Sequence, residues 1–177
     1  LHMEADEHYL YVHMLSHSYR ISRFSGDIEK KSDRDWIDAN TFEEVMTLLD
    51  LVCDSRDNRF LTGKWKNMTD FGLMFHRNLL ENKVDPWAEK FQADPEGFHK
   101  ACLALGGKPF SLGDIAYVIE LFDGLSFLVQ LWFGDEEFPA SLRFLWDENA
   151  LMYLKYETMY FAVGLLLQRI RSLMTGP

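Results

Sequence analysis

The sequence predicts an α+β fold, in which a small antiparallel sheet with a central Asp-Gly hairpin is packed by helices. Three observations favour this class. Asp123-Gly124 lies between two apolar runs and is the strongest hairpin signal in the chain, because a type I′ turn needs positive φ at both central positions. Apolar residues repeat at helical spacing after Thr41. Residues 156–174 would form a helix whose first half is apolar on nearly every side, which predicts a buried C-terminal helix.

The length and charge of the chain restrict its class. A chain of 177 residues fits a single domain over residues 1–177, with residues 1–3 set aside as a cloning remnant. It carries 28 acidic and 18 basic residues, and the net charge of −10 repels nucleic-acid phosphates and anionic lipids, so neither nucleic acid nor a membrane is an expected partner. The longest apolar run, residues 159–167, is too short to span a bilayer. With two distant cysteines and no secretion-signal pattern, the expected location is cytoplasmic.

Residues 4–105 are expected to form a mainly helical half that contains one small hairpin. A short helix is expected over residues 4–15. Residues 19–24 and 27–30 then flank Ser25-Gly26, a pair typical of a tight turn, and they predict an exposed hairpin.

A second helix follows a capping box. Thr41 and Glu44 have the spacing in which each side chain satisfies a backbone N–H of the other, so the helix is predicted to begin just after Thr41. The apolar side chains expected to face the core are Phe42, Val45, Met46, Leu49, Val52 and Cys53. Residues 56–67 have no period and predict a loop anchored by Trp65, and another helix is expected over residues 71–81.

Proline and glycine mark two further helices. Asp85-Pro86 and Asp94-Pro95 each place an N-cap acceptor before a proline suited to the first helical position, so a helix is predicted to begin at each proline. Gly106-Gly107 ends the second of these helices, because glycine readily adopts the left-handed conformation.

Residues 106–177 are expected to hold the sheet and the C-terminal helix. Strands are predicted at residues 114–122, 126–133 and 141–146 from their apolar, β-branched and aromatic content.

The register of the central hairpin follows from its two-residue turn. Phe122 pairs with Leu125 and, if the register is unbroken, Asp114 pairs with Phe133. One face then holds Val118, Val129 and Leu131, and the other holds Ile115, Ile119, Leu128 and Trp132. Because both faces are largely apolar, the hairpin is expected to be central and covered on both sides.

The acidic stretch Gly134-Asp-Glu-Glu-Phe-Pro139 follows a predicted strand directly and suggests a polar site. The predicted register makes Asp114 and Asp135 diagonal neighbours, with Cβ atoms about 7–8 Å apart. Together with Glu137 they would hold a divalent cation, or would split their pKa values into an acid and a base. The alternative is that these acids cap turns and keep a loop hydrated.

Other residues give weaker signals for a site. His13 and His17 would share one face of a helix and ligate a metal, with solvent-exposed histidines as the alternative. Trp65, in a loop, is expected to line a cavity, whereas Trp132 and Trp146 are expected to pack in the core. Both cysteines are expected to be small core residues. The sequence contains no known catalytic signature and identifies no cofactor.

The C-terminal third resembles the uncharacterised bacterial domain-of-unknown-function family 3786. The resemblance rests on Gly113-Asp114, the Gly-Asp-x-Glu-Phe-Pro stretch at 134–139, Leu145-Trp-Asp147 and Tyr153-Leu-Lys-Tyr-Glu157, with Gly63-Lys-Trp65, Phe91 and Gly106-Gly107 further upstream. It implies a setting in the metabolism of anaerobic microbes. Some members carry a cysteine-rich iron–sulfur region that this chain lacks, so a redox role does not carry over. The motif positions that the resemblance marks as candidates are Gly107, Asp114, Asp135, Glu137, Phe138, Pro139 and Asp147.

The expected function is a non-enzymatic ligand-binding or accessory module of anaerobic bacterial metabolism, whose partner is a small molecule or another metabolic protein. Its pocket is expected near the acidic stretch and Trp65. The candidate ligand-binding residues are Trp65, Gly107, Asp114, Asp135, Glu136, Glu137 and Asp147. One alternative is a metal-dependent enzyme that uses Asp114, Asp135 and Glu137 with a divalent metal as cofactor. The other is a structural interaction subunit with a large exposed apolar patch.

Overall fold

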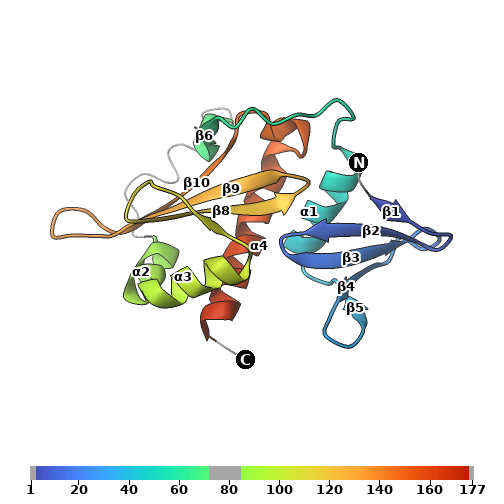
Figure 1. The fold of residues 1–177 in the computed structure, drawn as a ribbon, viewed down its shortest axis with the longest axis horizontal. Coiled ribbons are helices and arrows are strands. Elements are labelled where there is room, and N and C mark those ends of the chain that lie inside the picture. The colour runs from blue at the N-terminus through green and yellow to red at the C-terminus, as the bar shows by residue number, and fades with distance from the viewer. Residues whose placement is uncertain (1–2, 72–84, 176–177) are drawn as a thin grey trace.

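The structure, a computed structural model, describes residues 3–71 and 85–175 and confirms the α+β class. These residues form two antiparallel five-stranded sheets and four α-helices (Figure 1). The N-terminal sheet has the strand order β1-β2-β3-β4-β5, and the second sheet has the order β6-β10-β9-β8-β7. No helix in this part of the chain is long and apolar enough to cross a membrane.

The N-terminal sheet is a meander whose first strands replace an expected helix. Its strands are β1 (Glu4–Ala5), β2 (Tyr9–Met14), β3 (His17–Ser22), β4 (Ile28–Lys31) and β5 (Trp36–Asp38). The prediction of a helix over residues 4–15 is therefore wrong. A tight turn at Leu15 and Ser16, with φ of 46° and 61°, joins β2 to β3 without the usual glycine or asparagine. The hairpin at Ser25-Gly26 is confirmed.

Helix α1 (Phe42–Cys53) begins where the sequence predicted, but it buries a different face. The Thr41 side chain makes no capping hydrogen bond. The buried residues of α1 are Glu44, Thr47, Leu48, Asp50 and Leu51. Phe42, Leu49 and Cys53 are exposed, so the expected core-facing stripe is wrong at these positions, whereas Val45 and Val52 are partly buried against the core. The most buried face is centred on Leu48 and Leu51, where Glu44 and Asp50 also find buried polar partners.

Helices α2 (Pro86–Ala93) and α3 (Pro95–Ala104) confirm the predicted starts. The carboxylates of Asp85 and Asp94 accept the N–H groups of Trp87 and Gly97, each at 2.9 Å. Gly106, with φ of 75°, follows the end of α3 as predicted. The helix expected over residues 71–81 lies, apart from its first residue, outside the described residues.

The second sheet confirms the three predicted strands and the turn between the first two. Its strands are β6 (Trp65–Asn67), β7 (Lys108–Pro109), β8 (Ile115–Phe122), β9 (Leu125–Trp132) and β10 (Ser141–Asp147). Asp123 and Gly124 have φ of 48° and 84°, as a type I′ turn requires, and Phe122 pairs with Leu125.

A β-bulge between Glu120 and Phe122 overturns the rest of the predicted register. Ile115 pairs with Leu131 instead of Trp132, so the predicted pairing of Asp114 with Phe133 is wrong. One extra residue shifts every later pair, and the predicted assignment of side chains to the two faces is wrong for the same reason. The pairs Ile115–Leu131, Tyr117–Val129 and Ile119–Phe127 share one face.

Helix α4 (Tyr156–Thr175) is the buried C-terminal helix that the sequence predicted. It packs against α1 and α3 and crosses the middle of the molecule (Figure 1). Two short 3₁₀ helices, Met68–Asp70 and Ala150–Met152, complete the described elements.

The two sheets meet at the tip of the β2–β3 hairpin. The N–H of Leu15 donates to the carbonyl of Leu121, at the bulge, over 2.8 Å, and the Ser16 hydroxyl donates to the carbonyl of Leu105 over 2.8 Å. Leu15 is almost completely buried, and the Arg169 side chain on α4 donates to its carbonyl oxygen. The hairpin tip is therefore held by β8, by the end of α3 and by α4.

Candidate functional site

A cavity of about 500 Å³ opens on the N-terminal sheet. It is lined by Glu4, Tyr11, Val12, His13, Ser18, Tyr19, Lys31 and Trp36. This volume is within the range of roughly 300–1,000 Å³ typical of small-molecule sites. Figure 1 shows the sheet at one end of the molecule, beside α1, with the tip of its β2–β3 hairpin at the end of α3.

The strand register gathers the polar and aromatic lining on one face of the sheet, which we call the outer face. Alternate residues of a strand point to the same side. Glu4, Tyr11, Arg20, Glu29 and Asp38 are successive cross-strand partners and form one row across all five strands. The next row contains His13 opposite Ser18 and Lys31 opposite Trp36. The opposite, inner face carries the buried side chains Val12, Met14, Tyr19, Ile21 and Ile28.

Two aromatic rings form the walls of the cavity. The ring centroids of Tyr11 and Trp36 lie 6.3 Å apart, although β3 and β4 separate their strands. The guanidinium carbon of Arg20 lies 4.7 Å from the Trp36 ring centroid and is fixed by hydrogen bonds of 2.6 and 2.9 Å to the Glu29 carboxylate. The Tyr11 hydroxyl donates to Asp6 over 2.7 Å, which raises the pKa of Tyr11. Both walls are thus held in place without a ligand.

The remaining lining groups are polar. The Lys31 ammonium lies 5.2 Å from the Trp36 ring centroid, and within the described residues it has no ion-pair partner. His13 and Ser18 face each other, but among the described hydrogen bonds none joins them. Glu4 lies on the short strand β1, at the edge of the sheet. The cavity can therefore offer an aromatic surface to one side of a ligand and a cation, Lys31, to its polar group.

A buried polar network supports the sheet from its inner face. The Tyr19 hydroxyl donates to Glu44 over 2.5 Å, and nitrogen atoms of Lys30 and Arg169 lie 3.0 and 3.1 Å from the same Glu44 oxygen. Burial raises the pKa of Glu44, but hydrogen bonds from Tyr19 and Lys30 and the charges of Lys30 and Arg169 outweigh it, so this pKa is below its ordinary value. The pKa of Tyr19 is raised, mainly by burial. The network joins β3 and β4 to α1 and α4.

The histidines predicted to bind metal do not lie together. His13 and His17 lie on opposite faces of the β2–β3 hairpin, so the hypothesis that they share a helix face is wrong. His17 is half-buried, and its Nδ1 lies 3.0 Å from Arg169. Burial and the Arg169 charge lower the pKa of His17. Of the two cysteines, Cys102 is buried as predicted.

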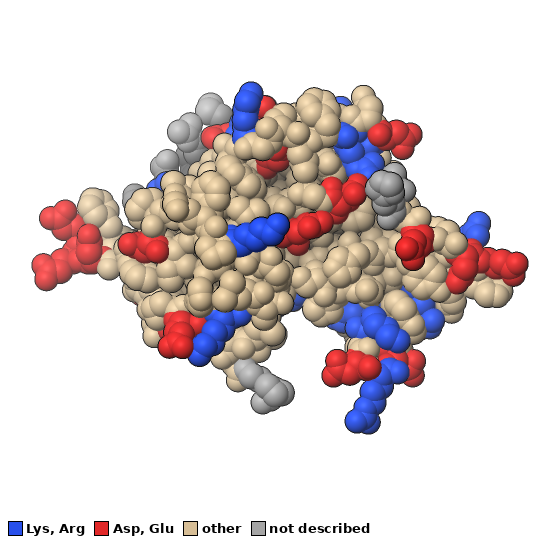
Figure 2. Space-filling view, in the orientation of Figure 1, with Lys and Arg blue, Asp and Glu red and all other residues tan. Residues whose placement is uncertain are grey.

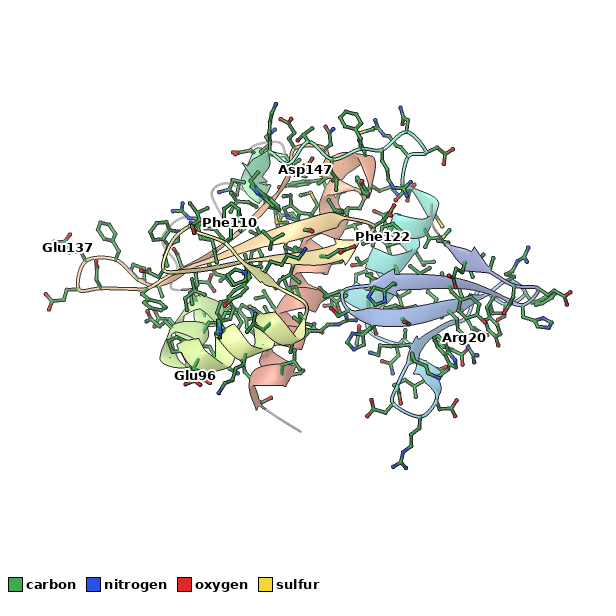
Figure 3. The ribbon with its side chains drawn as sticks, viewed as in Figure 1. Arg20, Glu96, Phe110, Phe122, Glu137 and Asp147 are labelled. Carbon is green, nitrogen blue, oxygen red and sulfur yellow. The ribbon has the colours of Figure 1, made fainter. Side chains whose placement is uncertain are left out.

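Asp135, Glu136 and Glu137 lie in the loop between β9 and β10, at the other end of the molecule, and Asp114 directly precedes β8. Asp114 accepts the Phe133 N–H over 2.7 Å. Asp135 accepts the N–H groups of Glu137 and Phe138, each at 2.8 Å, and these hydrogen bonds lower the pKa of Asp135. Glu136 and Glu137 are exposed, and Figure 3 shows Glu137 on the loop between β9 and β10, which projects away from the body. Figure 2 shows acidic side chains gathered at this tip.

The structure does not gather Asp114, Asp135 and Glu137 into a metal site. In residues 3–71 and 85–175, no group of three or more His, Cys, Asp and Glu side chains is placed to hold a metal ion. The observed hydrogen bonds of Asp114 and Asp135 are those of residues that shape a turn, as the alternative interpretation of the acidic stretch proposed.

The other three candidates lie in packed surroundings. Asp147 is buried and accepts the N–H groups of Thr62 and Gly63 over 2.9 and 2.7 Å, which fixes that loop to β10. A Cβ at Gly107 would lie 2.6 Å from the Cys102 carbonyl oxygen. Trp65 is half-buried, with its ring 6.4 Å from that of Phe110. Figure 3 shows Asp147 and Arg20 in separate regions, so these candidates do not join the cavity on the N-terminal sheet.

The lining residues Tyr11, Lys31 and Trp36 were not among the sequence candidates. The available signal was the alternation of outward Tyr9, Tyr11 and His13 with inward-facing apolar residues in β2, which is typical of a half-buried strand. Their meeting also depends on the register of the four strands β2 to β5, which the sequence does not give.

One family model matches the chain, that of Domain of unknown function (DUF3786), over residues 1–169. No curated protein and no solved structure matches it.

Proposed function

Because the chain belongs to the DUF3786 family and carries a preorganised cavity, we propose that it is a non-enzymatic module that binds a small molecule on the outer face of the N-terminal sheet. The single observation that carries the proposal is the contacting pair of aromatic rings, Tyr11 and Trp36, which Asp6 and Arg20 hold in place at the cavity. The module's place in anaerobic bacterial metabolism rests on the family resemblance alone.

Preorganised walls favour binding because the folded protein has already lost the side-chain entropy that a mobile site would lose on binding. Flat rings stack on tyrosine and tryptophan with useful energy beyond simple burial. Arg20 keeps the Trp36 ring in place from one side, and Asp6 holds Tyr11 by its hydroxyl. A ligand would therefore meet fixed aromatic side chains in an open, partly apolar recess.

The alternatives have less support. A metal-dependent enzyme would need Asp114, Asp135 and Glu137 to converge, and in the described part of the chain they form no such group. Nucleophilic chemistry in the cavity would need a base within hydrogen-bond reach of Ser18, whereas no described hydrogen bond joins Ser18 to His13. The remaining alternative, an interaction subunit, would use exposed apolar side chains such as Phe42.

The proposal is tested with ¹H–¹⁵N NMR spectra of the full chain during titration with a set of neutral fused-ring aromatic fragments. We expect shifts confined to β2–β5 and a five- to tenfold loss of affinity, roughly the value of one aromatic stacking contact, in Trp36→Leu. The matched control is Trp132→Leu, which removes a 40% exposed tryptophan from β9, outside the cavity. Shifts that gather elsewhere, or that persist unchanged in Trp36→Leu, would contradict the proposal.

A further inference from the structure

We infer that the ligand is a flat aromatic anion, such as an aromatic carboxylate, whose charged end binds beside Lys31. The inference rests on the proposed function and names the ligand class for the same cavity. It is carried by the distribution of donors and charges along the two cross-strand rows of the outer face.

Hydrogen-bond donors gather in the second row, at the β3–β4 side of the cavity. His13 lies opposite Ser18, and Lys31 lies opposite Trp36, so an imidazole, a hydroxyl and an ammonium line one strip of the lining. An ammonium next to an aromatic wall suits a carboxylate attached to a ring, because the ring stacks while its substituent reaches the charge. A neutral ligand would make no ion pair with Lys31.

Two of the acids near the cavity already have partners. Glu29 is engaged by both Arg20 contacts, and Asp6 accepts the Tyr11 hydroxyl. Glu4 is the acid in the lining, and it lies on β1, three strands from Lys31 on β4. An anion would therefore meet Lys31 at the β4 side of the cavity, with Glu4 at its β1 side.

A cationic ligand is disfavoured by the same geometry. The Arg20 guanidinium lies 4.3 Å from the Tyr9 ring centroid and 4.7 Å from that of Trp36, so a cation already occupies these aromatic faces. Lys31 lies near the same Trp36 ring and would repel a second positive charge. The labelled Arg20 in Figure 3 marks this end of the molecule.

The test compares two probes of nearly equal shape, 2-naphthoate and its neutral amide, 2-naphthamide, by ¹H–¹⁵N NMR titration of the full chain. We expect 2-naphthoate to bind about three- to tenfold more tightly at 50 mM salt, and the ratio to shrink at 0.5 M salt because of screening. Lys31→Met removes the difference. The matched control is Lys66→Met on β6, where the lysine lies 5.0 Å from the Phe71 ring centroid but does not line the cavity.

The outcomes separate the two claims. Equal affinities for both probes, with shifts in β2–β5, would overturn the anion inference and leave the binding function standing. A preference for 2-naphthoate that survives Lys31→Met but is lost in Lys66→Met would also overturn it. The absence of shifts in β2–β5 with either probe at 5 mM would overturn both claims.

Discussion

The carboxylate of Glu44 on α1 lies 3.1 Å from the guanidinium of Arg169 on α4, and this buried pair also binds the hydroxyl of Tyr19 on β3. The Glu44 carboxylate thus links α1 to α4 and to β3. The side chains of Glu44 and Arg169 are only 3% and 10% exposed, so neither has water as an adequate substitute for its partner.

We expect Glu44→Gln to destabilise the protein by about 3–5 kcal/mol, because it leaves the Arg169 charge buried without a counter-ion. Urea unfolding followed by circular dichroism measures this change. Glu43→Gln makes the same chemical change one residue away, and Glu43 has no ion-pair partner among the described residues, so it should cost less than about 0.5 kcal/mol. Similar effects of both substitutions would show that the network contributes little.

Protonation of His17 should weaken the fold in mild acid. Burial and the charge of Arg169 lower the pKa of folded His17 below its ordinary value of 6.5, so between the two pKa values the unfolded chain binds more protons. The stability that neutral His17 provides is therefore present above pH 6.5 and is lost as the pH falls towards the lower, folded pKa. His17→Gln should flatten this part of the stability curve, measured as the urea midpoint from pH 8 to pH 5.

The control for His17 is the exposed histidine on the same hairpin. His13→Gln should leave the slope of the urea midpoint against pH unchanged, because His13 faces the open side of the sheet. If the slope disappeared in His13→Gln instead of His17→Gln, the pH dependence of stability could not be assigned to His17.

Gly107 is expected to be required for packing. In Gly107→Ala the new Cβ would lie 2.6 Å from the Cys102 carbonyl oxygen, so the end of α3 must move, at a cost of about 2 kcal/mol or more. Gly164→Ala, in the middle of α4, meets nothing closer than the Glu43 Cγ at 3.6 Å and should raise stability by about 0.5–1 kcal/mol. Thermal unfolding of both variants checks the contrast. If Gly107→Ala were as stable as the parent protein, packing would not explain this glycine. It would then remain a candidate ligand-binding residue.

Local signals predicted the parts of the fold that depend on local chemistry. Asp85 and Asp94 cap their helices because a carboxylate two or three residues before an N–H can reach it without help from the rest of the chain. The turn at Asp123-Gly124 is equally local. The β2–β3 turn was not predicted because Leu15 and Ser16 have positive φ. Their conformation is supported by hydrogen bonds to Leu121, Leu105 and Arg169, which are distant in the sequence.

Distant partners explain the remaining errors. Glu44 has the spacing of a capping box, but its hydrogen bonds go to Tyr19, 25 residues before it, and to Arg169, 125 residues after it. The bulge between Glu120 and Phe122 shifted the register that placed Asp114 near Asp135. The candidate site was missed for the same kind of reason, because Tyr11 and Trp36 meet only when the four strands β2 to β5 are aligned.

The dependence of the β2–β3 hairpin on Arg169 has a consequence for synthesis. Arg169 is translated 125 residues after Glu44, a delay of about 6–25 s at roughly 5–20 residues per second. During that interval Glu44 lacks its ion pair with Arg169, and the carbonyl of Leu15 lacks the hydrogen bond from Arg169. We therefore expect a protease to cleave the first forty residues of ribosome-bound chains that stop before Arg169. Chaperones that recognise apolar strands would bind the same residues.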